Sequence, residues 1–222
     1  MRFRIDLKIF LFLILFYLTK QIETYVMIII FAILHELGHL MMGLLLGMKP
    51  EKLELNPYGV SISFKLTPKD YNKKVLGGNL LEQKKILVAL AGPLTNLLIL
   101  VIVMQLKGEV FSNLMILYSN LLLIIFNLLP IYPLDGGRIL KGILHIFSGK
   151  RKAEKYSNLI SFVMLILLTF VASIAVYYIE NISIFIIIVF LWGLYIQEDI
   201  RYRKKNKIYD LIEKTIEIGG DK

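Results

Sequence analysis

Long apolar stretches dominate this sequence and limit the folds that it can adopt. About six of them stand out, at about residues 5–19, 25–47, 86–106, 113–129, 157–178 and 182–196, and a hydrocarbon core about 30 Å thick needs roughly 20 helical residues to cross it. Hydrophobic residues make up 57% of the chain, which is too apolar for an ordinary soluble domain. The sequence therefore predicts an all-α polytopic membrane protein with about six transmembrane helices.

The distribution of basic residues predicts how these helices are oriented. Lys and Arg accumulate in the cytoplasmic segments of membrane proteins, and an even number of spans places both termini on one side. If that side is cytoplasmic, it holds all of the 26 basic residues except Lys20 and Lys107. The formal net charge of +9 then reflects orientation in a lipid bilayer, and we expect no nucleic-acid partner. Because the chain has no cysteine, disulfides and thiolate metal sites are excluded.

Two polar segments accompany the apolar stretches. In the 49–84 connection, every second residue from Val60 to Leu66 is apolar, which predicts a short β-hairpin or edge strand at the cytoplasmic face. The basic C-terminal segment suits an interfacial amphipathic helix or, equally, a solvated flank of the last span. We expect a membrane domain over residues 1–196 and a cytoplasmic tail over residues 197–222.

A five-residue motif in the second stretch carries the chemistry. It reads His35-Glu36-Leu37-Gly38-His39. Residues at i and i+4 of a helix lie on one face, so both imidazoles can reach one metal ion with Glu36 beside them as a base. A carboxylate near the centre of a bilayer costs at least about 2.5 kcal/mol, which favours a functional role. The alternative is that these three side chains only join helices through hydrogen bonds.

A catalytic zinc ion usually takes three protein ligands and leaves a fourth position for water. The best third candidate is Asp135, in the run from Asn127 to Gly137, where prolines prevent a regular helix and Gly136 and Gly137 permit unusual backbone angles. Asp135 has a simpler interpretation as a capping or interfacial carboxylate. His145 is the rival ligand, although it is expected to lie in an interfacial helix at the level of the lipid headgroups.

These residues predict zinc-dependent hydrolysis of a peptide bond, with Glu36 moving the proton from water to the leaving amine. Two other classes of protein remain open. A non-catalytic membrane adaptor of the same fold would tolerate the loss of Glu36. A metal transporter would carry polar or acidic residues along several spans, whereas Glu36 is the one acid near the middle of a predicted span.

The motifs together resemble the site-2 protease family of intramembrane zinc metalloproteases. The resemblance rests on the motif at 35–39, on Asn56-Pro57-Tyr58-Gly59, on Ala91-Gly92-Pro93-Leu94-Thr95-Asn96, and on the run 127–137. It implies one zinc ion per chain held by His35, His39 and Asp135, with Glu36 as the catalytic base. Other residues that the resemblance places at the site, to hold substrate or shape it, are Asn56, Pro57, Asn96, Asn127 and Pro133. The amides have an equally good interpretation as interhelical hydrogen-bonding groups.

Within that family the run 127–137 is most similar to the stage IV sporulation proteases that process the sigma factor K precursor. This implies regulated intramembrane proteolysis of a membrane-embedded or membrane-tethered substrate such as a sigma factor precursor, with an inhibitory membrane partner. It also implies a location in the cell membrane or in a membrane surrounding the forespore. We expect no CBS or PDZ domain, whereas the sporulation subgroup usually carries a CBS domain and other branches of the family a PDZ domain.

Three further features carry expectations about packing and substrate binding. Gly43 and Gly47 form a GxxxG pattern, which is typical of close helix packing. Gly92-Pro93 is expected to kink the third span. The predicted strand at 60–66 offers an edge to which an extended substrate segment can pair.

Overall fold

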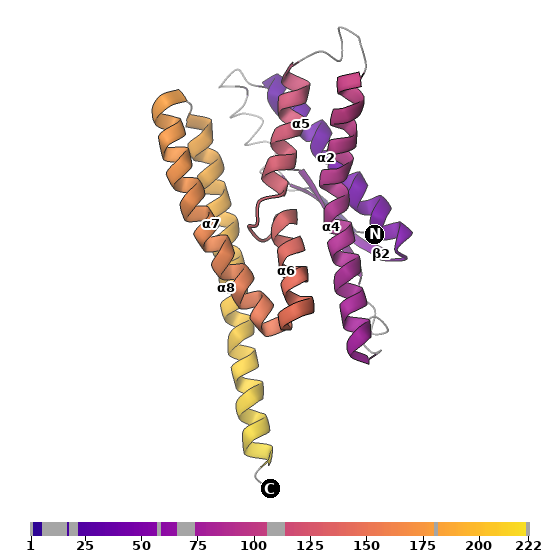
Figure 1. Cartoon of the computed structure of the whole chain (residues 1–222), viewed down its shortest axis with the longest axis vertical. Coiled ribbons are helices and arrows are strands. Elements are labelled where there is room, and N and C mark those ends of the chain that lie inside the picture. The colour runs from indigo at the N-terminus through magenta and orange to yellow at the C-terminus, as the bar shows by residue number, and fades with distance from the viewer. Residues whose placement is uncertain are drawn as a thin grey trace. The chain divides into compact units, whose positions relative to one another are not determined.

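The computed structural model of the chain describes residues 2–5, 17, 22–56, 59–65, 74–105, 114–179 and 182–220. The chain folds into two compact units, Met1–Leu129 and Pro130–Lys222. The first unit contains the helices α2 (Ile22–Leu45), α4 (Lys74–Gln105) and α5 (Leu114–Asn127). The second contains α6 (Asp135–Ser148), α7 (Lys150–Ile179) and α8 (Ile182–Gly220) (Figure 1). The predicted all-α polytopic class with a small hairpin is confirmed.

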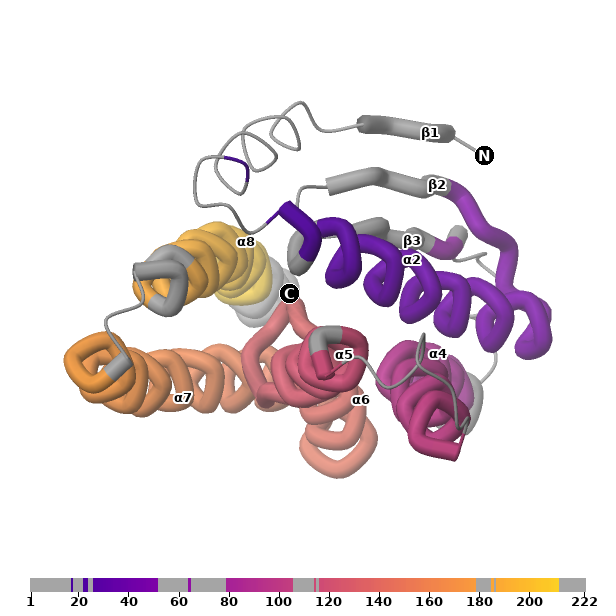
Figure 2. Tube along the Cα trace, turned by 90° about the horizontal axis from the view of Figure 1, so that it is seen from above, coloured from indigo at the N-terminus to yellow at the C-terminus, as the bar shows by residue number. Residues whose placement is uncertain are grey.

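Helix α2 is the central element of the first unit, with α4 and α5 on one side of it and the sheet on the other (Figure 2). It contains no proline, and its end is fixed by Gly47, whose φ of 73° suits glycine because a Cβ is disfavoured there. Gly47 N–H donates to Leu44 O at 2.9 Å and Met48 N–H to Gly43 O at 2.8 Å. These two bonds cap the carbonyls of the last turn in a Schellman motif.

Close contacts between helices and a small apolar cluster hold the first unit together. A Cβ built on Gly38 would lie 2.2 Å from Thr95 Oγ1, so α2 and α4 can approach this closely only because residue 38 is glycine. Phe31 and Ala32 of α2 and Leu123 of α5 form a buried cluster. This packing places the middle of α2, with its histidines, directly against α4.

The sheet has three strands, β1 (Arg2–Ile5), β2 (Lys49–Asn56) and β3 (Gly59–Lys65), in the order β1-β2-β3. β2 and β3 form the predicted hairpin in the 49–84 connection, and β1 pairs with β2 in parallel. The sequence did not indicate β1, which has only four residues. A strand of four residues is too short to show a clear alternation of apolar and polar residues, and it forms because it pairs with β2.

The GxxxG pattern predicts that Gly43 packs against another helix, but its nearest neighbour is a residue of a strand. A Cβ on Gly43 would lie 2.2 Å from Cζ of Phe64, so Gly43 accommodates an aromatic ring of β3 and not another helix. Gly47 ends α2 and has nothing within 4 Å of a built Cβ. Both glycines are explained by the hairpin and by the helix end.

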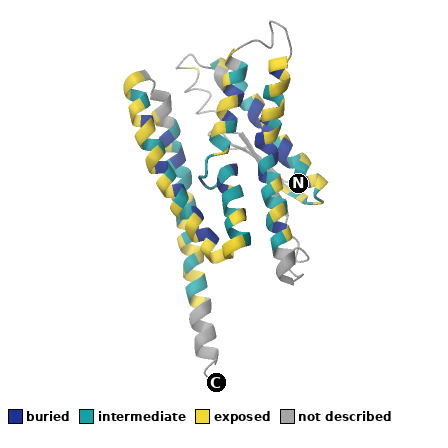
Figure 3. Cartoon of the chain, in the orientation of Figure 1, coloured by how far each residue is buried: buried dark blue, intermediate teal, exposed yellow. Residues whose placement is uncertain are grey.

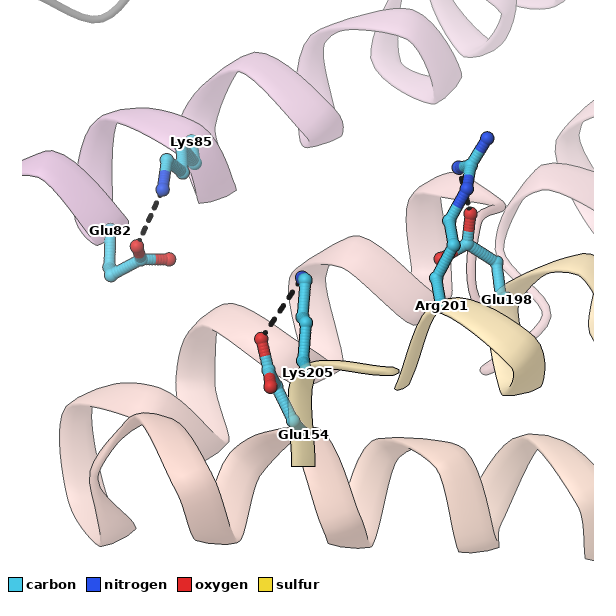
Figure 4. Close-up of polar contacts among 6 residues, drawn as sticks. All are labelled: Glu82, Lys85, Glu154, Glu198, Arg201 and Lys205. Carbon is cyan, nitrogen blue, oxygen red and sulfur yellow. Dashed lines mark hydrogen bonds and ion pairs between the residues drawn. The ribbon is translucent and has the colours of Figure 1, made fainter. Parts of the chain in front are cut away.

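In the second unit, α7 and α8 lie side by side (Figure 1). Trp192 Nε1 of α8 donates to Thr169 Oγ1 of α7 at 3.0 Å. Nearer the C-terminus, Lys205 Nζ of α8 lies 3.2 Å from Glu154 Oε1 of α7 (Figure 4). The basic tail is helical as expected, but it continues α8 without a break instead of forming a separate helix.

Three helices in the described part of the chain are long and apolar enough to cross a membrane: Val26–Leu45, Asn79–Gln105 and Lys150–Tyr178. A shorter apolar helix spans Ile116–Asn127. Figure 3 shows exposed positions along each of these helices, and many are large hydrophobic residues such as Met41 and Phe170. An apolar surface of this kind fits contact with lipid. The predicted first span at 5–19 lies, apart from residue 5 in β1 and residue 17, outside the described residues.

Candidate metal centre

His35 and His39 of α2 lie next to each other, as their i, i+4 spacing predicts. Their Nε2 atoms are 3.2 Å apart, their ring planes are perpendicular, and the ring centroids are 4.7 Å apart. Both residues are 3% exposed. The two imidazoles therefore present the same ring nitrogen toward one point inside the protein.

A hydrogen bond to α4 orients His39. Its Nδ1 lies 2.6 Å from Val88 O, and since a carbonyl can only accept, Nδ1 carries the proton. Nε2 of the neutral ring is then left with its lone pair. Histidines that bind metals typically donate their other N–H to a carbonyl or carboxylate in this way.

Gly92 of α4 makes room for the histidine pair. A Cβ built there would lie 2.5 Å from His35 Nε2 and 2.6 Å from His39 Nε2. Any side chain at this position would occupy the space in front of the two nitrogens. The sequence indicated Gly92 only as half of a Gly-Pro kink, because a contact between two helices leaves no local pattern.

The histidine pair fits a zinc ion. Two nitrogens each about 2.0–2.1 Å from a tetrahedral zinc ion lie about 3.4 Å from each other, and the observed separation is 3.2 Å. The space in front of them is kept clear by Gly92. Glu36 is partly exposed and follows His35 on the same helix, as a base beside the metal ligands requires.

Asp135 belongs to the second unit and begins α6. It is 4% exposed, and its Oδ1 lies 3.4 Å from Arg138 Nη1. The first turn of a helix stabilises a carboxylate through its free N–H groups and dipole. As predicted, the stretch before Asp135 that contains Pro130 and Pro133 is not helical.

His145, the rival ligand, lies in the last turn of the same helix. The ten residues that separate it from Asp135 correspond to a rise of about 15 Å along a helix. One metal ion cannot bind both side chains at that separation.

The predicted amides have different surroundings. Asn96 is fully buried, and neither polar atom of its side chain has a hydrogen-bond partner in the part of the chain that the structure describes. Asn127 Nδ2 donates to Leu123 O, one turn earlier, at 3.1 Å, which is a local helix contact. Asn56 ends β2, but its side chain and all of Pro57 lie outside the described residues.

Comparisons with known proteins identify relatives of this chain. A family model described as peptidase family M50 matches residues 107–171. A zinc metalloprotease of Methanocaldococcus jannaschii is 32% identical over 154 residues, which are 66% of this chain and 42% of that protein. The chain is therefore similar to peptidase family M50 over residues 107–171 and to this zinc metalloprotease over 154 residues.

The chain is also similar to two further proteins. Stage IV sporulation protein FB of Bacillus subtilis is 25% identical over 132 residues, 55% of this chain and 41% of that protein. The site-2 protease from Methanocaldococcus jannaschii has the same fold, with a TM-score of 0.61 and 24% identity over 87% of this chain and 88% of that one. The chain spans less than half the length of the two curated relatives.

The sequence did not reveal the role of two residues in the surroundings of the candidate site. One is Gly92, described above. The other is Asn120 of α5, which is 1% exposed and donates Nδ2–H to Asn96 O at 2.6 Å. A signal for Asn120 was available, because an amide within an apolar stretch needs a hydrogen-bond partner.

Proposed function

We propose that this chain is an intramembrane zinc endopeptidase of the peptidase M50 family that hydrolyses a peptide bond in membrane-embedded or membrane-tethered protein substrates. The observation that carries the proposal is the pair of buried imidazole nitrogens, 3.2 Å apart, on an apolar helix long enough to cross a membrane. A site inside the bilayer gives access to substrate segments that soluble proteases cannot reach.

In this proposal His35, His39 and Asp135 hold one zinc ion. The three buried side chains are a donor set that could hold a metal ion, and two nitrogens with one carboxylate oxygen are common ligands of catalytic zinc. When bound, zinc lowers the pKa of a coordinated water and polarises a carbonyl. Arg138 Nη1 lies 3.4 Å from Oδ1 of Asp135 and pairs with this carboxylate.

Glu36 acts as the general base and acid. Its carboxylate takes a proton from the attacking water and delivers it to the nitrogen of the scissile bond, so that the amine can leave. Asn96 holds substrate: its buried amide has both a donor and an acceptor to offer to an extended backbone. Asn56, Pro57, Asn127 and Pro133 shape the site around it.

The setting of the reaction follows from charge and from the relatives. Both termini lie in the cytoplasm, where the basic residues gather. The substrate is a membrane-associated protein, such as a sigma factor precursor, and an inhibitory membrane protein restrains cleavage until it is needed. The similarity to stage IV sporulation protein FB supports this substrate class and a membrane around the forespore.

The test compares wild type with Glu36→Gln, each co-expressed with a membrane-tethered sigma factor precursor. We expect the variant to bind zinc normally and to cleave about 10²- to 10⁴-fold more slowly, the usual contribution of a general base. Bound zinc is measured on the purified protein, and cleavage is followed by immunoblotting. Equal processing by both proteins would disprove the hydrolase and favour the membrane adaptor.

A second experiment tests the third ligand. Asp135→Asn removes the proposed carboxylate ligand while preserving its shape, and we expect it to lose bound zinc. His145→Ala, near the other end of α6, is the matched control and should retain zinc. If His145→Ala loses zinc and Asp135→Asn keeps it, the ligand has been assigned to the wrong residue.

A further inference from the structure

The segment just before Asp135 has little regular structure of its own to hold it. Residues 128–134 lie between α5 and α6, and Pro130 and Pro133 have no N–H to donate. Leu134 N–H donates to Ile131 O at 2.8 Å, within the segment. A metal ligand that follows such a segment needs an external anchor, because ligand positions must be held to within about 0.5 Å.

Helix α7 provides a hydrogen bond to this segment. Tyr132 N–H donates to Ser161 Oγ at 3.0 Å, and Ser161 is 1% exposed. The Ser161 hydroxyl itself donates to Ser157 O, one turn earlier, at 2.7 Å. Because the hydroxyl donates its only proton to the Ser157 carbonyl, Ser161 Oγ acts as an acceptor for Tyr132 N–H.

Two contacts with α6 hold the same segment from its other side. A Cβ on Gly137 would lie 2.4 Å from both Ile131 C and Tyr132 N, so the segment packs directly on the first turn of α6. Lys141 Nζ lies 4.2 Å from the centre of the Tyr132 ring, within the range of a cation–π contact. The backbone at Tyr132 is thus held between α6 and α7, three residues before Asp135.

We infer that Ser161 is a positioning residue for the third metal ligand: its hydroxyl fixes the backbone at Tyr132 and, through it, the carboxylate of Asp135. This inference rests on the proposed role of Asp135. Without the hydroxyl, a buried N–H has lost its acceptor, and the segment can move away from the position that metal binding requires.

The chain offers an isosteric test at this position. Ser161→Thr keeps the hydroxyl. Ser161→Val has the same shape as the threonine variant but lacks the hydroxyl. Both variants add carbon atoms at a residue that lines a cavity of about 30 Å³, so Ser161→Thr controls for the added volume. Thr169→Val is the matched control, since Thr169 makes the same kind of bond to Leu165 O and accepts from Trp192 of α8 instead.

Two readouts are measured on the full chain in detergent: zinc affinity by competition with a chromophoric chelator, and hydrogen–deuterium exchange of residues 130–138 in the zinc-free protein. We expect Ser161→Val to bind zinc about 10- to 100-fold more weakly, as for other residues that orient metal ligands, and to exchange faster in this segment. Ser161→Thr and Thr169→Val should match wild type in both.

Unchanged zinc affinity in Ser161→Val would overturn the inference, whether or not exchange becomes faster. An equal loss in Thr169→Val would also overturn it, because the effect would then reflect general weakening of α7. Failure of the proposed function itself looks different: Asp135→Asn would then bind zinc as wild type does, and Asp135 would not be a ligand for Ser161 to position.

Discussion

Two imidazole nitrogens that face one point require empty space in front of them, and at the residue scale this explains Gly92. The glycine lies on α4, opposite His35 and His39, where even a methyl group would come within 2.6 Å of both Nε2 atoms. A metal ion needs the space that the missing side chain leaves. Gly92 therefore contributes to metal binding although it has no side chain with which to bind.

Gly92→Ala should abolish or strongly weaken zinc binding. The new methyl group would push the imidazoles apart or fill the metal position, while alanine is the better helix former by about 1 kcal/mol. Zinc content of the purified protein is the measurement, with circular dichroism to confirm helix content. Gly193→Ala in α8, where a Cβ has nothing within 4 Å, should bind zinc normally; full zinc content in Gly92→Ala would contradict the steric argument.

At the element scale, the pairing of α7 and α8 depends on polar contacts as well as on apolar packing. Glu154 is 6% exposed and pairs with Lys205, which is 52% exposed. Glu154 lines a cavity of about 30 Å³, which is large enough for about one or two water molecules. This ion pair joins the basic C-terminal part of α8 to α7.

Lys205→Met should destabilise the protein by about 1–3 kcal/mol, because it leaves a buried carboxylate without its cationic partner. Adding Glu154→Gln should recover part of the loss, since the remaining side chain is then neutral. Thermal unfolding in detergent measures both variants. If the single variant melts like wild type, the ion pair contributes nothing to the α7–α8 pairing.

The same pair predicts sensitivity to alkaline pH. Burial lowers the pKa of Lys205, but the charge and hydrogen bond of Glu154 raise it by more, so the pKa lies above its ordinary value of 10.5. A cation whose pKa is raised by folding stabilises the protein fully below its unfolded pKa, and this stabilisation is lost as the pH rises through the folded pKa. The difference in melting temperature between wild type and Lys205→Met should therefore shrink as the pH rises above the ordinary lysine pKa of 10.5; a difference that persisted in strong alkali would have another origin.

The hairpin is the second element with a testable role. β3 lies at one edge of the described sheet, and an edge strand can pair with an extended substrate segment. Ile62→Pro should lower cleavage and leave zinc content intact, because proline removes a backbone donor far from the metal ligands in sequence. Ile62→Val, which keeps the strand, is the control, and unchanged cleavage by the proline variant would remove the strand from the mechanism.

At the scale of the whole molecule, the three proposed zinc ligands come from segments that lie far apart in the sequence. His35 and His39 belong to the first unit and Asp135 to the second. A ligand that binds only the folded protein stabilises it by RT ln(1 + [L]/Kd), about 2.7 kcal/mol at one hundred times Kd. Zinc bound by the three proposed ligands would therefore stabilise the folded protein.

Removal of zinc with a chelator should lower the melting temperature of the wild-type protein and leave that of Asp135→Asn unchanged. Differential scanning fluorimetry with and without added zinc measures the shift. His145→Ala, which keeps the proposed ligands, should respond as wild type does. A zinc-dependent shift of normal size in Asp135→Asn would show that the stabilising ion does not need this carboxylate.

The sequence by itself determined the features that depend on neighbouring residues. Apolar stretches predicted the helices, the i, i+4 spacing brought His35 and His39 together, and Pro130 and Pro133 interrupted the helix before Asp135. The alternation around Ile62 predicted the hairpin. Each of these follows from local periodicity or from the backbone limits of proline, both of which can be read along a single stretch of chain.

Only the tertiary structure decided the contacts between distant segments. It placed Gly92 in front of the histidines, Val88 O on His39, Phe64 over Gly43, and Ser161 against Tyr132. These contacts join residues on different helices or strands, and a glycine that makes room or a serine that accepts one bond has no periodic signature. The ligand types were therefore evident in the sequence, whereas the groups that orient and accommodate them were decided by packing.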